Sequence, residues 1–243
     1  MTEERESSFM KAVFHGVVAD DLIFPYPEMS KDERENVAMM IDSIRKFVSA
    51  KVDSAKIDRT HTIPDDVIQG MRELGLFGLS IPEEYGGLGL SGSGYARVMQ
   101  EVAALDSSLA VTIGAHQSIG CKAIMLFGNE KQKQEWLPRL SSDWISAFCL
   151  SEPNVGCDAG GQETHCELSE DGEFYILNGE KKWATSGALS SLFTVMAKQK
   201  IADPKSGKVR ERVTALVCHP EMEGVEIFQK NRSKCGIRGT WQA

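Results

Sequence analysis

Two segments of the chain combine an aromatic ring, hydroxyl groups and a glycine-containing turn. The first, residues 148–158, reads Phe-Cys-Leu-Ser-Glu-Pro-Asn-Val-Gly-Cys-Asp, and the second, residues 178–187, reads Asn-Gly-Glu-Lys-Lys-Trp-Ala-Thr-Ser-Gly. The first segment opens on an apolar run over residues 145–150, which predicts a strand whose end presents free backbone amides. The proline, asparagine and glycine that follow predict a sharp turn rich in backbone amides.

The second segment places Trp183 two residues before Thr185. In an extended strand alternate side chains share one face, so this spacing predicts that the indole ring and the hydroxyl lie side by side. A large aromatic and a donor on one face, beside a turn rich in amides, are typical of a site for a flat heterocycle with a pyrophosphate tail. The two segments together therefore predict a flavin site.

Both segments resemble the signature of the acyl-CoA dehydrogenases, flavoenzymes that introduce a trans double bond between C2 and C3 of an acyl-CoA thioester. The family pattern runs hydrophobic-Ser/Thr-Glu-Pro-x-x-Gly-Ser-Asp, then Asn-Gly-x-Lys-x-Trp-Ile-Thr/Ser-Asn. Further similarity covers residues 75–89, 114–120 and 128–138, and the start is most similar to the very-long-chain branch. The resemblance implies FAD as cofactor and a C-terminal helical bundle that carries the catalytic glutamate. The chain stops before that bundle, so a fragment of a longer enzyme is expected.

The resemblance also implies roles for individual residues. Backbone groups and the Ser151 hydroxyl would bind the pyrimidine edge of the flavin, Trp183 would lie against the ring, and Thr185 would donate toward flavin N5. Cys157 stands where the family usually has serine, and its contact to substrate or cofactor should be weaker because a thiol donates poorly. The expected cofactor residues are Phe148, Cys149, Leu150, Ser151, Gly156, Cys157, Trp183, Ala184 and Thr185.

Several of these residues also have a structural interpretation. Trp183 could be a core aromatic of a β domain, and Cys157 could be a small side chain that fills a tight turn. Glu152 is expected to shape its turn rather than to act as a base, and His116 is expected to pack or hydrogen-bond rather than to react. The five histidines are not clustered, so we predict no metal site, and no catalytic residue is assigned within the chain.

The first part of the chain carries helical patterns. Apolar residues recur at three- and four-residue steps from Ser30 to Val52, with Ser30 as the N-cap and Glu33 in the capping-box position. Further helices are predicted over residues 64–74, 94–105, 108–127 and 130–140. We therefore predict an all-α domain over residues 1–143.

The pattern after residue 143 is that of strands. Strands are predicted over residues 173–185, 191–200 and 210–219, with a hairpin tip over residues 203–207. The fold class is thus α+β, with an antiparallel β-sandwich or barrel over residues 144–243. By the resemblance, this β domain is truncated at its C-terminal end.

Charge and cysteine content limit the possible binding partners and the cellular location of the protein. The net charge of −8 opposes a general attraction to nucleic acid, and no apolar run is long enough to predict a membrane span. The six cysteines form no Cys-x-x-Cys pair, which favours a reducing compartment. The acidic N-terminus resembles neither a secretory signal nor a transit peptide. We predict a location in the bacterial cytoplasm, with the mitochondrial matrix as the alternative.

The leading hypothesis is an FAD-dependent acyl-CoA dehydrogenase that acts on long-chain acyl-CoA. By the resemblance it passes electrons to electron-transfer flavoprotein and forms a homo-oligomer when complete. The chain alone is expected to have little activity, because the catalytic glutamate is missing. Two alternatives stay open: a non-catalytic or assembly protein that keeps the fold as an interaction surface, and an acyl-CoA oxidase.

Overall fold

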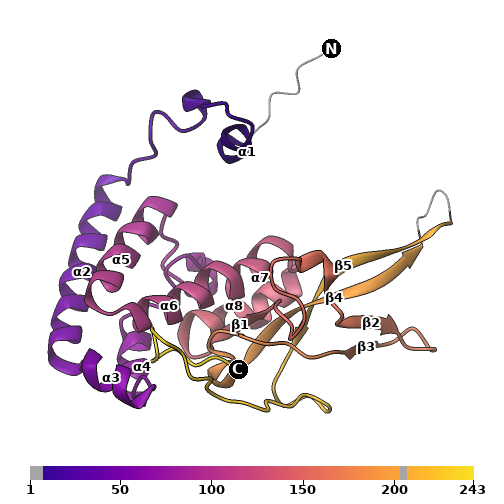
Figure 1. Cartoon of the computed structure of the whole chain (residues 1–243). Coiled ribbons are helices and arrows are strands. Elements are labelled where there is room, and N and C mark those ends of the chain that lie inside the picture. Colours follow the sequence, from indigo (N-terminus) through magenta and orange to yellow (C-terminus); the bar gives the residue numbers. More distant parts are fainter. Residues whose placement is uncertain (1–7, 203–206) are drawn as a thin grey trace.

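The structure, a computed structural model, describes residues 8–202 and 207–243, in which a helical part precedes a sheet (Figure 1). The last helix ends at Ser142 and the first strand begins at Ser146, which confirms the predicted order of helices and sheet. The α-helices are α1 (Phe9–Phe14), α2 (Lys31–Lys51), α3 (Ser54–Thr60), α4 (Asp65–Glu73), α5 (Gly92–Leu105), α6 (Ser107–Ala115), α7 (Lys122–Phe127) and α8 (Glu130–Ser142).

Helix α2 begins as predicted but uses its capping glutamate differently. The Ser30 hydroxyl accepts the amide of Glu33 at 3.1 Å. The Glu33 carboxylate, however, accepts the amide of Ser91 at 2.7 Å, directly before α5. The expected capping box is therefore only half formed, because Glu33 satisfies a free amide near the start of a neighbouring helix instead of its own.

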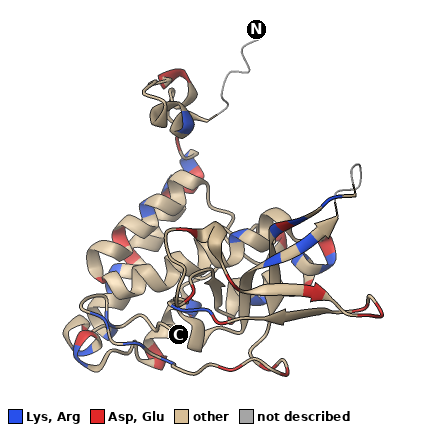
Figure 2. Ribbon diagram, turned by 45° about the vertical axis from the view of Figure 1, so that its right-hand side comes forward, with Lys and Arg blue, Asp and Glu red and all other residues tan. Residues whose placement is uncertain are grey.

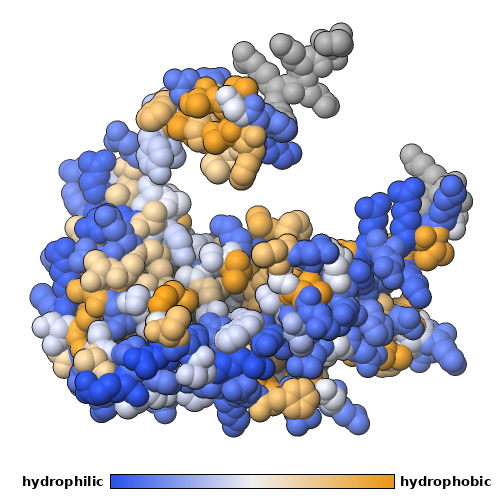
Figure 3. All heavy atoms as spheres, viewed as in Figure 1, coloured by the Kyte–Doolittle hydropathy of each residue, from blue (hydrophilic) through white to orange (hydrophobic). Residues whose placement is uncertain are grey.

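The helical part has a continuous apolar core. Ile44, Met71, Phe77 and Ile113 are at most 1% exposed and belong to one cluster. Helix α1 lies apart from this core (Figure 1), and its Phe14 is 85% exposed. Apolar side chains gather on the surface of this part of the chain (Figure 3).

The segment Ser107–Phe127 is a helical run of 21 residues with a mean hydropathy of 1.2 in its most apolar stretch. By length and composition alone it could cross a membrane. Half of that stretch is buried within the fold, and the core helix of a water-exposed domain meets the same two criteria. The run is therefore weak support for a membrane span.

The sheet has five strands: β1 (Ser146–Cys149), β2 (His165–Leu168), β3 (Tyr175–Asn178), β4 (Leu192–Ala202) and β5 (Val209–Cys218). Their order is β1-β4-β2-β3, with β5 paired to β4. The pairs β1–β4 and β2–β4 are parallel, so the sheet is mixed rather than antiparallel throughout. Parallel pairing needs a long connection, and the turn region and the β2–β3 hairpin provide it between β1 and β4.

Two of the expected strands match and one is shorter. Strands β4 and β5 pair antiparallel from Phe193 opposite Cys218 to Ala202 opposite Val209. The expected hairpin tip lies mostly in residues 203–206, outside the described residues. Strand β3 ends at Asn178, seven residues before the predicted end, and the next residue, Gly179, has a φ of 152°, which favours glycine.

His116 joins the helical part to the sheet. It begins a π-helical turn, His116–Cys121, and is fully buried. Its Nδ1 accepts the amide of Ser146 in β1 at 3.0 Å, and its Nε2 lies 2.9 Å from the carbonyl of Leu140 and 3.1 Å from that of Phe77. Burial lowers the pKa of His116 to about 4, although the two carbonyls favour the charged form. His116 is thus a neutral structural link.

Because the folded chain keeps His116 neutral, folding should weaken in mild acid. Below pH 6.5 the unfolded chain binds a proton at this histidine that the folded chain does not bind until about pH 4. The free energy of unfolding should therefore fall by about 3 kcal/mol between those pH values through this group alone.

Urea unfolding of the wild type and of His116→Gln at pH 7, 5.5 and 4 measures this contribution. The stability advantage of the wild type should shrink as the pH falls, because glutamine does not titrate. His165→Gln, at an exposed site, is the matched control and should lower the stability at pH 7 much less than His116→Gln does. Equal pH dependence of the wild type and His116→Gln would contradict the assignment.

Candidate functional site

The first segment forms a tight turn directly after β1. Glu152 and Val155 exchange backbone hydrogen bonds of 2.9 and 3.2 Å. Strand β1 ends at Cys149, so Leu150 and Ser151 lie between the strand and the turn. The hydroxyl of Ser151 makes no hydrogen bond within the described residues, which leaves it available to a ligand.

A buried ion pair ties this turn to the second segment. The side chains of Lys181 and Glu152 are 10% and 1% exposed, and their charged atoms lie 2.7 Å apart. The Lys181 ammonium also donates to the carbonyl of Leu150 and to the side-chain oxygen of Gln162, each at 3.1 Å. All three ammonium protons therefore have an acceptor, and the charge is fully compensated.

The Glu152 carboxylate is equally well bonded. It accepts the amides of Glu163 at 2.5 Å and Thr164 at 3.0 Å in addition to Lys181. Burial alone would raise the pKa of Glu152, but the hydrogen bonds from Lys181 and the amides outweigh it and lower the pKa to about 2. Such a group stays ionised and cannot serve as a general base near neutral pH, which agrees with its expected role in shaping the turn.

The two predicted segments lie side by side. The amide of Lys182 donates to the carbonyl of Ser151 at 2.8 Å, so the backbones meet directly. Trp183 follows, and its side chain is 47% exposed. The indole is therefore not a core aromatic, and the part of its ring that the protein leaves exposed is accessible to a ligand. The guanidinium of Arg232 and the ammonium of Lys182 lie 5.5 and 5.6 Å from the ring centroid.

The expected extended strand at Trp183 is wrong. Trp183 has a φ of 65°, in the left-handed region, so the alternation of an extended strand is broken between it and Thr185. Residues 184–186 instead pair with the end of the chain. Ala184 and Ala243 exchange backbone hydrogen bonds of 3.0 and 3.1 Å, and the amide of Ser186 donates to the carbonyl of Trp241.

This pairing brings Gln242 to Thr185. The side-chain amide of Gln242 donates to the Thr185 hydroxyl at 2.8 Å. Sequence analysis missed Gln242, because the pairing joins segments that are far apart in the chain and no periodic pattern reports it. The paired segments fix the Thr185 hydroxyl against Gln242.

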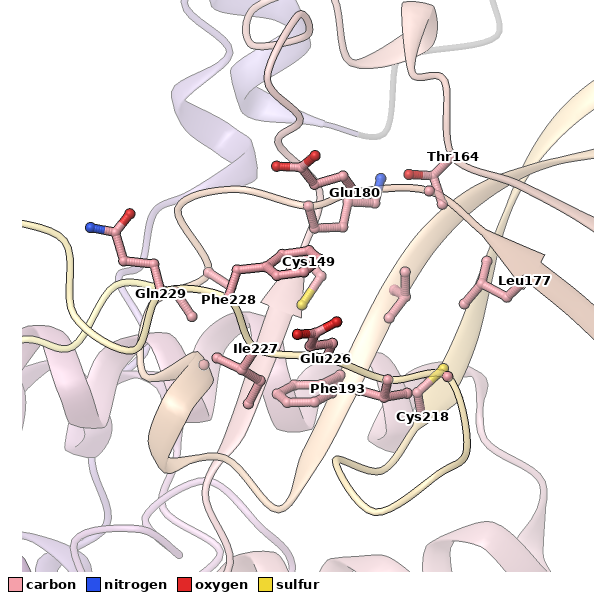
Figure 4. A pocket seen from close by; sticks show the side chains of 18 of the residues that line it. Cys149, Thr164, Leu177, Glu180, Phe193, Cys218, Glu226, Ile227, Phe228 and Gln229 are labelled. Atoms are coloured by element: carbon pink, nitrogen blue, oxygen red, sulfur yellow. The ribbon is translucent and has the colours of Figure 1, made fainter.

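The side chains of two expected cofactor residues face elsewhere. Cys149 and Ala184 are 7% and 6% exposed and pack with Phe193 and Val195 in the core of the sheet. They border a cavity of about 300 Å³ that apolar and charged side chains line together, and Cys149 and Phe193 point into it (Figure 4). Phe148 lies on the opposite sheet face, because side chains alternate along β1. Cys149 and Ala184 can therefore meet a ligand on the Phe148 face only through their backbones.

The glycine turn is suited to an anion. Gly156, Cys157 and Asp158 are exposed, and none of their amides donates a hydrogen bond within the part of the chain that the structure describes. No atom lies within 4 Å of a Cβ built on Gly156, so a group could approach its backbone closely. Successive free amides of this kind bind phosphate groups. The exposed Cys157 does not fill the turn.

The charged side chains are dispersed over the helices and the sheet (Figure 2). Within residues 8–202 and 207–243, no group of three His, Cys, Asp or Glu side chains could hold a metal ion. The chemistry of the site therefore comes from the ring of Trp183, the hydroxyls of Ser151 and Thr185, and the amides of the turn.

Comparison with known proteins gives two family matches. The model of the acyl-CoA dehydrogenase N-terminal domain matches residues 34–143, and the model of the middle domain matches residues 147–243. The chain is 40% identical over 235 residues to the mitochondrial very long-chain specific acyl-CoA dehydrogenase of Homo sapiens. It is 38% identical over 243 residues to the probable acyl-CoA dehydrogenase FadE10 of Mycobacterium tuberculosis.

These alignments cover 96% and 98% of the chain but only 36% of each relative, so the chain spans about a third of their length. Among solved structures, the acyl-CoA dehydrogenase of Bacillus anthracis complexed with FAD is 30% identical, with a TM-score of 0.70. That match covers 91% of this chain and 36% of the solved one.

The buried ion pair gives a stability prediction. Lys181→Met leaves the Glu152 carboxylate buried without its cation, so the free energy of unfolding should fall by about 3 kcal/mol. The double variant Lys181→Met/Glu152→Gln should recover part of this loss, because the unpaired charge is gone. Denaturant unfolding of the three proteins measures both effects.

Lys198→Met is the matched control. It breaks the ion pair between Lys198 and Glu211, whose charged atoms lie 3.8 Å apart and whose side chains are 26% and 58% exposed. The free energy of unfolding should therefore fall by less than about 1 kcal/mol. Equal losses for Lys181→Met and Lys198→Met would show that the buried pair does not hold the turn.

Proposed function

The chain belongs to the acyl-CoA dehydrogenase family, and we propose that it forms the FAD-binding part of an enzyme that dehydrogenates long-chain acyl-CoA thioesters. The observation that carries this proposal is the meeting of the two motif segments around an exposed indole, with the Lys182 amide bonded to the Ser151 carbonyl. The free amides of the glycine turn suit the pyrophosphate of FAD.

The residues of the chain bind and orient in this proposal. The Ser151 hydroxyl and the adjacent backbone would hold the pyrimidine edge of the flavin, Trp183 would lie against the ring, and Thr185 would donate toward N5. FAD, when bound, supplies an acceptor for the hydride from the β-carbon of the acyl chain. Phe148, Leu150, Gly156 and Cys157 complete the surface, with Cys157 also toward the substrate, and Cys149 and Ala184 contribute backbone atoms.

The base that removes the α-proton is proposed to lie outside these residues. The buried carboxylate of the site, Glu152, is held by Lys181 and two amides, and its low pKa excludes it as a base.

We further propose electron-transfer flavoprotein as the electron acceptor and a homo-oligomer as the complete assembly. We also propose that the chain consists of two units, residues 1–143 and residues 144–243. The location is proposed to be the bacterial cytoplasm or the mitochondrial matrix, since the relatives include a mitochondrial and a mycobacterial protein.

One observation favours a second candidate, a non-catalytic protein that keeps the fold as an interaction surface. Cys157 presents an exposed thiol where the family usually has serine, which weakens a hydrogen bond at the site. An acyl-CoA oxidase would use the same flavin contacts, and comparing turnover with oxygen and with an artificial acceptor separates the two enzymes.

Titration of the purified chain with FAD tests the binding proposal. Loss of the stacking ring in Trp183→Ala should weaken FAD binding about tenfold, as expected for roughly 1.4 kcal/mol of ring contact. Phe174→Ala, at a residue that is 67% exposed, is the control and should bind FAD as the wild type does. A wild type without FAD affinity, or a Trp183→Ala variant with full affinity, would overturn the flavin site.

Activity gives a separate test. The FAD-loaded 243-residue chain should reduce an artificial dye only slowly with palmitoyl-CoA, because the proposed base is not among its residues. Brisk dye reduction would show that a base lies within the chain.

A further inference from the structure

We propose that Gln242 is a positioning residue that fixes the Thr185 hydroxyl as a hydrogen-bond donor toward the flavin. The inference rests on the proposed function. It adds a residue from the end of the chain to a site that the two motif segments otherwise define.

The geometry holds both residues in place. Gln242 is 8% exposed, and Gln242 and Thr185 face each other in an antiparallel bridge. The backbone bonds between Ala184 and Ala243 and between Ser186 and Trp241 flank this bridge on both sides. Neither residue can shift along the chain without breaking those bonds, so the 2.8 Å contact between the two side chains is fixed by the backbone.

The direction of this contact decides what Thr185 can do. A hydroxyl has one proton to donate and lone pairs that accept. Because the Gln242 amide donates to Thr185, the hydroxyl is an acceptor in this contact and its own proton is free. Within the described residues the hydroxyl makes no other hydrogen bond, so its proton can serve a ligand. Gln242 thereby makes the Thr185 hydroxyl a donor toward the ligand, and the proposed function places this hydroxyl toward flavin N5.

Three substitutions test whether Gln242 acts through the direction of its hydrogen bond to Thr185 or only through packing. Gln242→Glu offers an ionised carboxylate that only accepts, so it should draw the Thr185 proton away from the flavin. Gln242→Met removes the contact and leaves the hydroxyl free to rotate. Thr185→Val removes the hydroxyl itself. FAD affinity should fall about tenfold for Gln242→Glu and for Thr185→Val, and less for Gln242→Met, since one hydrogen bond is lost or misdirected.

The bound flavin supplies a second readout. The visible absorption band and the reduction potential of the flavin should shift in the same direction in Gln242→Glu and Thr185→Val. In the double variant the Glu substitution should add nothing, because the hydroxyl through which it acts is absent. Gln134→Glu, on the exposed surface of α8, adds the same charge away from the site and should leave both readouts unchanged.

The outcomes distinguish the inference from the proposed function. A wild type that binds no FAD overturns the proposed function and the inference with it. A wild type that binds FAD, with Gln242→Glu unchanged in affinity and spectrum, overturns the inference alone, as does full additivity in the double variant. If Gln242→Glu fails to fold by circular dichroism, Gln242→Met combined with Thr185→Val gives the same additivity test without a buried charge.

Discussion

The ion pair between Lys181 and Glu152 is the constraint on which the site depends. Both side chains are buried and have further hydrogen-bond partners. The Lys181 ammonium donates to the Leu150 carbonyl, and the Glu152 carboxylate accepts the amides of Glu163 and Thr164. A buried pair of this kind adds little net stability compared with apolar residues, but breaking it is costly. Its main effect is geometric, because it fixes Leu150, the residue directly after β1, against the segment that carries Trp183.

His116 places this assembly against the helices. Its ring bonds the amide of Ser146 on one side and carbonyls of the helical part on the other, so the start of β1 is fixed to the helical core. The histidine performs this role only while neutral, which its burial ensures. The strand is thus held at its first residue by His116 and just beyond its last residue by Lys181, and the position of the cofactor surface follows from both.

Local patterns predicted the helices and strands that local interactions determine. Ser30 and the apolar steps of α2 gave its start correctly, and the apolar runs of β4 and β5 gave those strands. Contacts between distant segments were not predictable. Glu33 caps the region before α5 rather than its own helix, β1 pairs in parallel with β4, and Gln242 meets Thr185 across 57 residues. In each case the partner is chosen by tertiary packing, which periodicity does not report.

The same reasoning explains why the expected extended strand at Trp183 is wrong. A left-handed residue that is not glycine is strained by about 1–2 kcal/mol, so the surrounding structure must hold it. The Lys182 amide is bonded to Ser151 on one side, and Ala184 is paired with Ala243 on the other. Between these two anchors the chain turns the indole outward while Ala184 stays in the core. The position of the exposed ring therefore depends on the pairing of three separate segments, and a change in any one of them should move the ring without touching it.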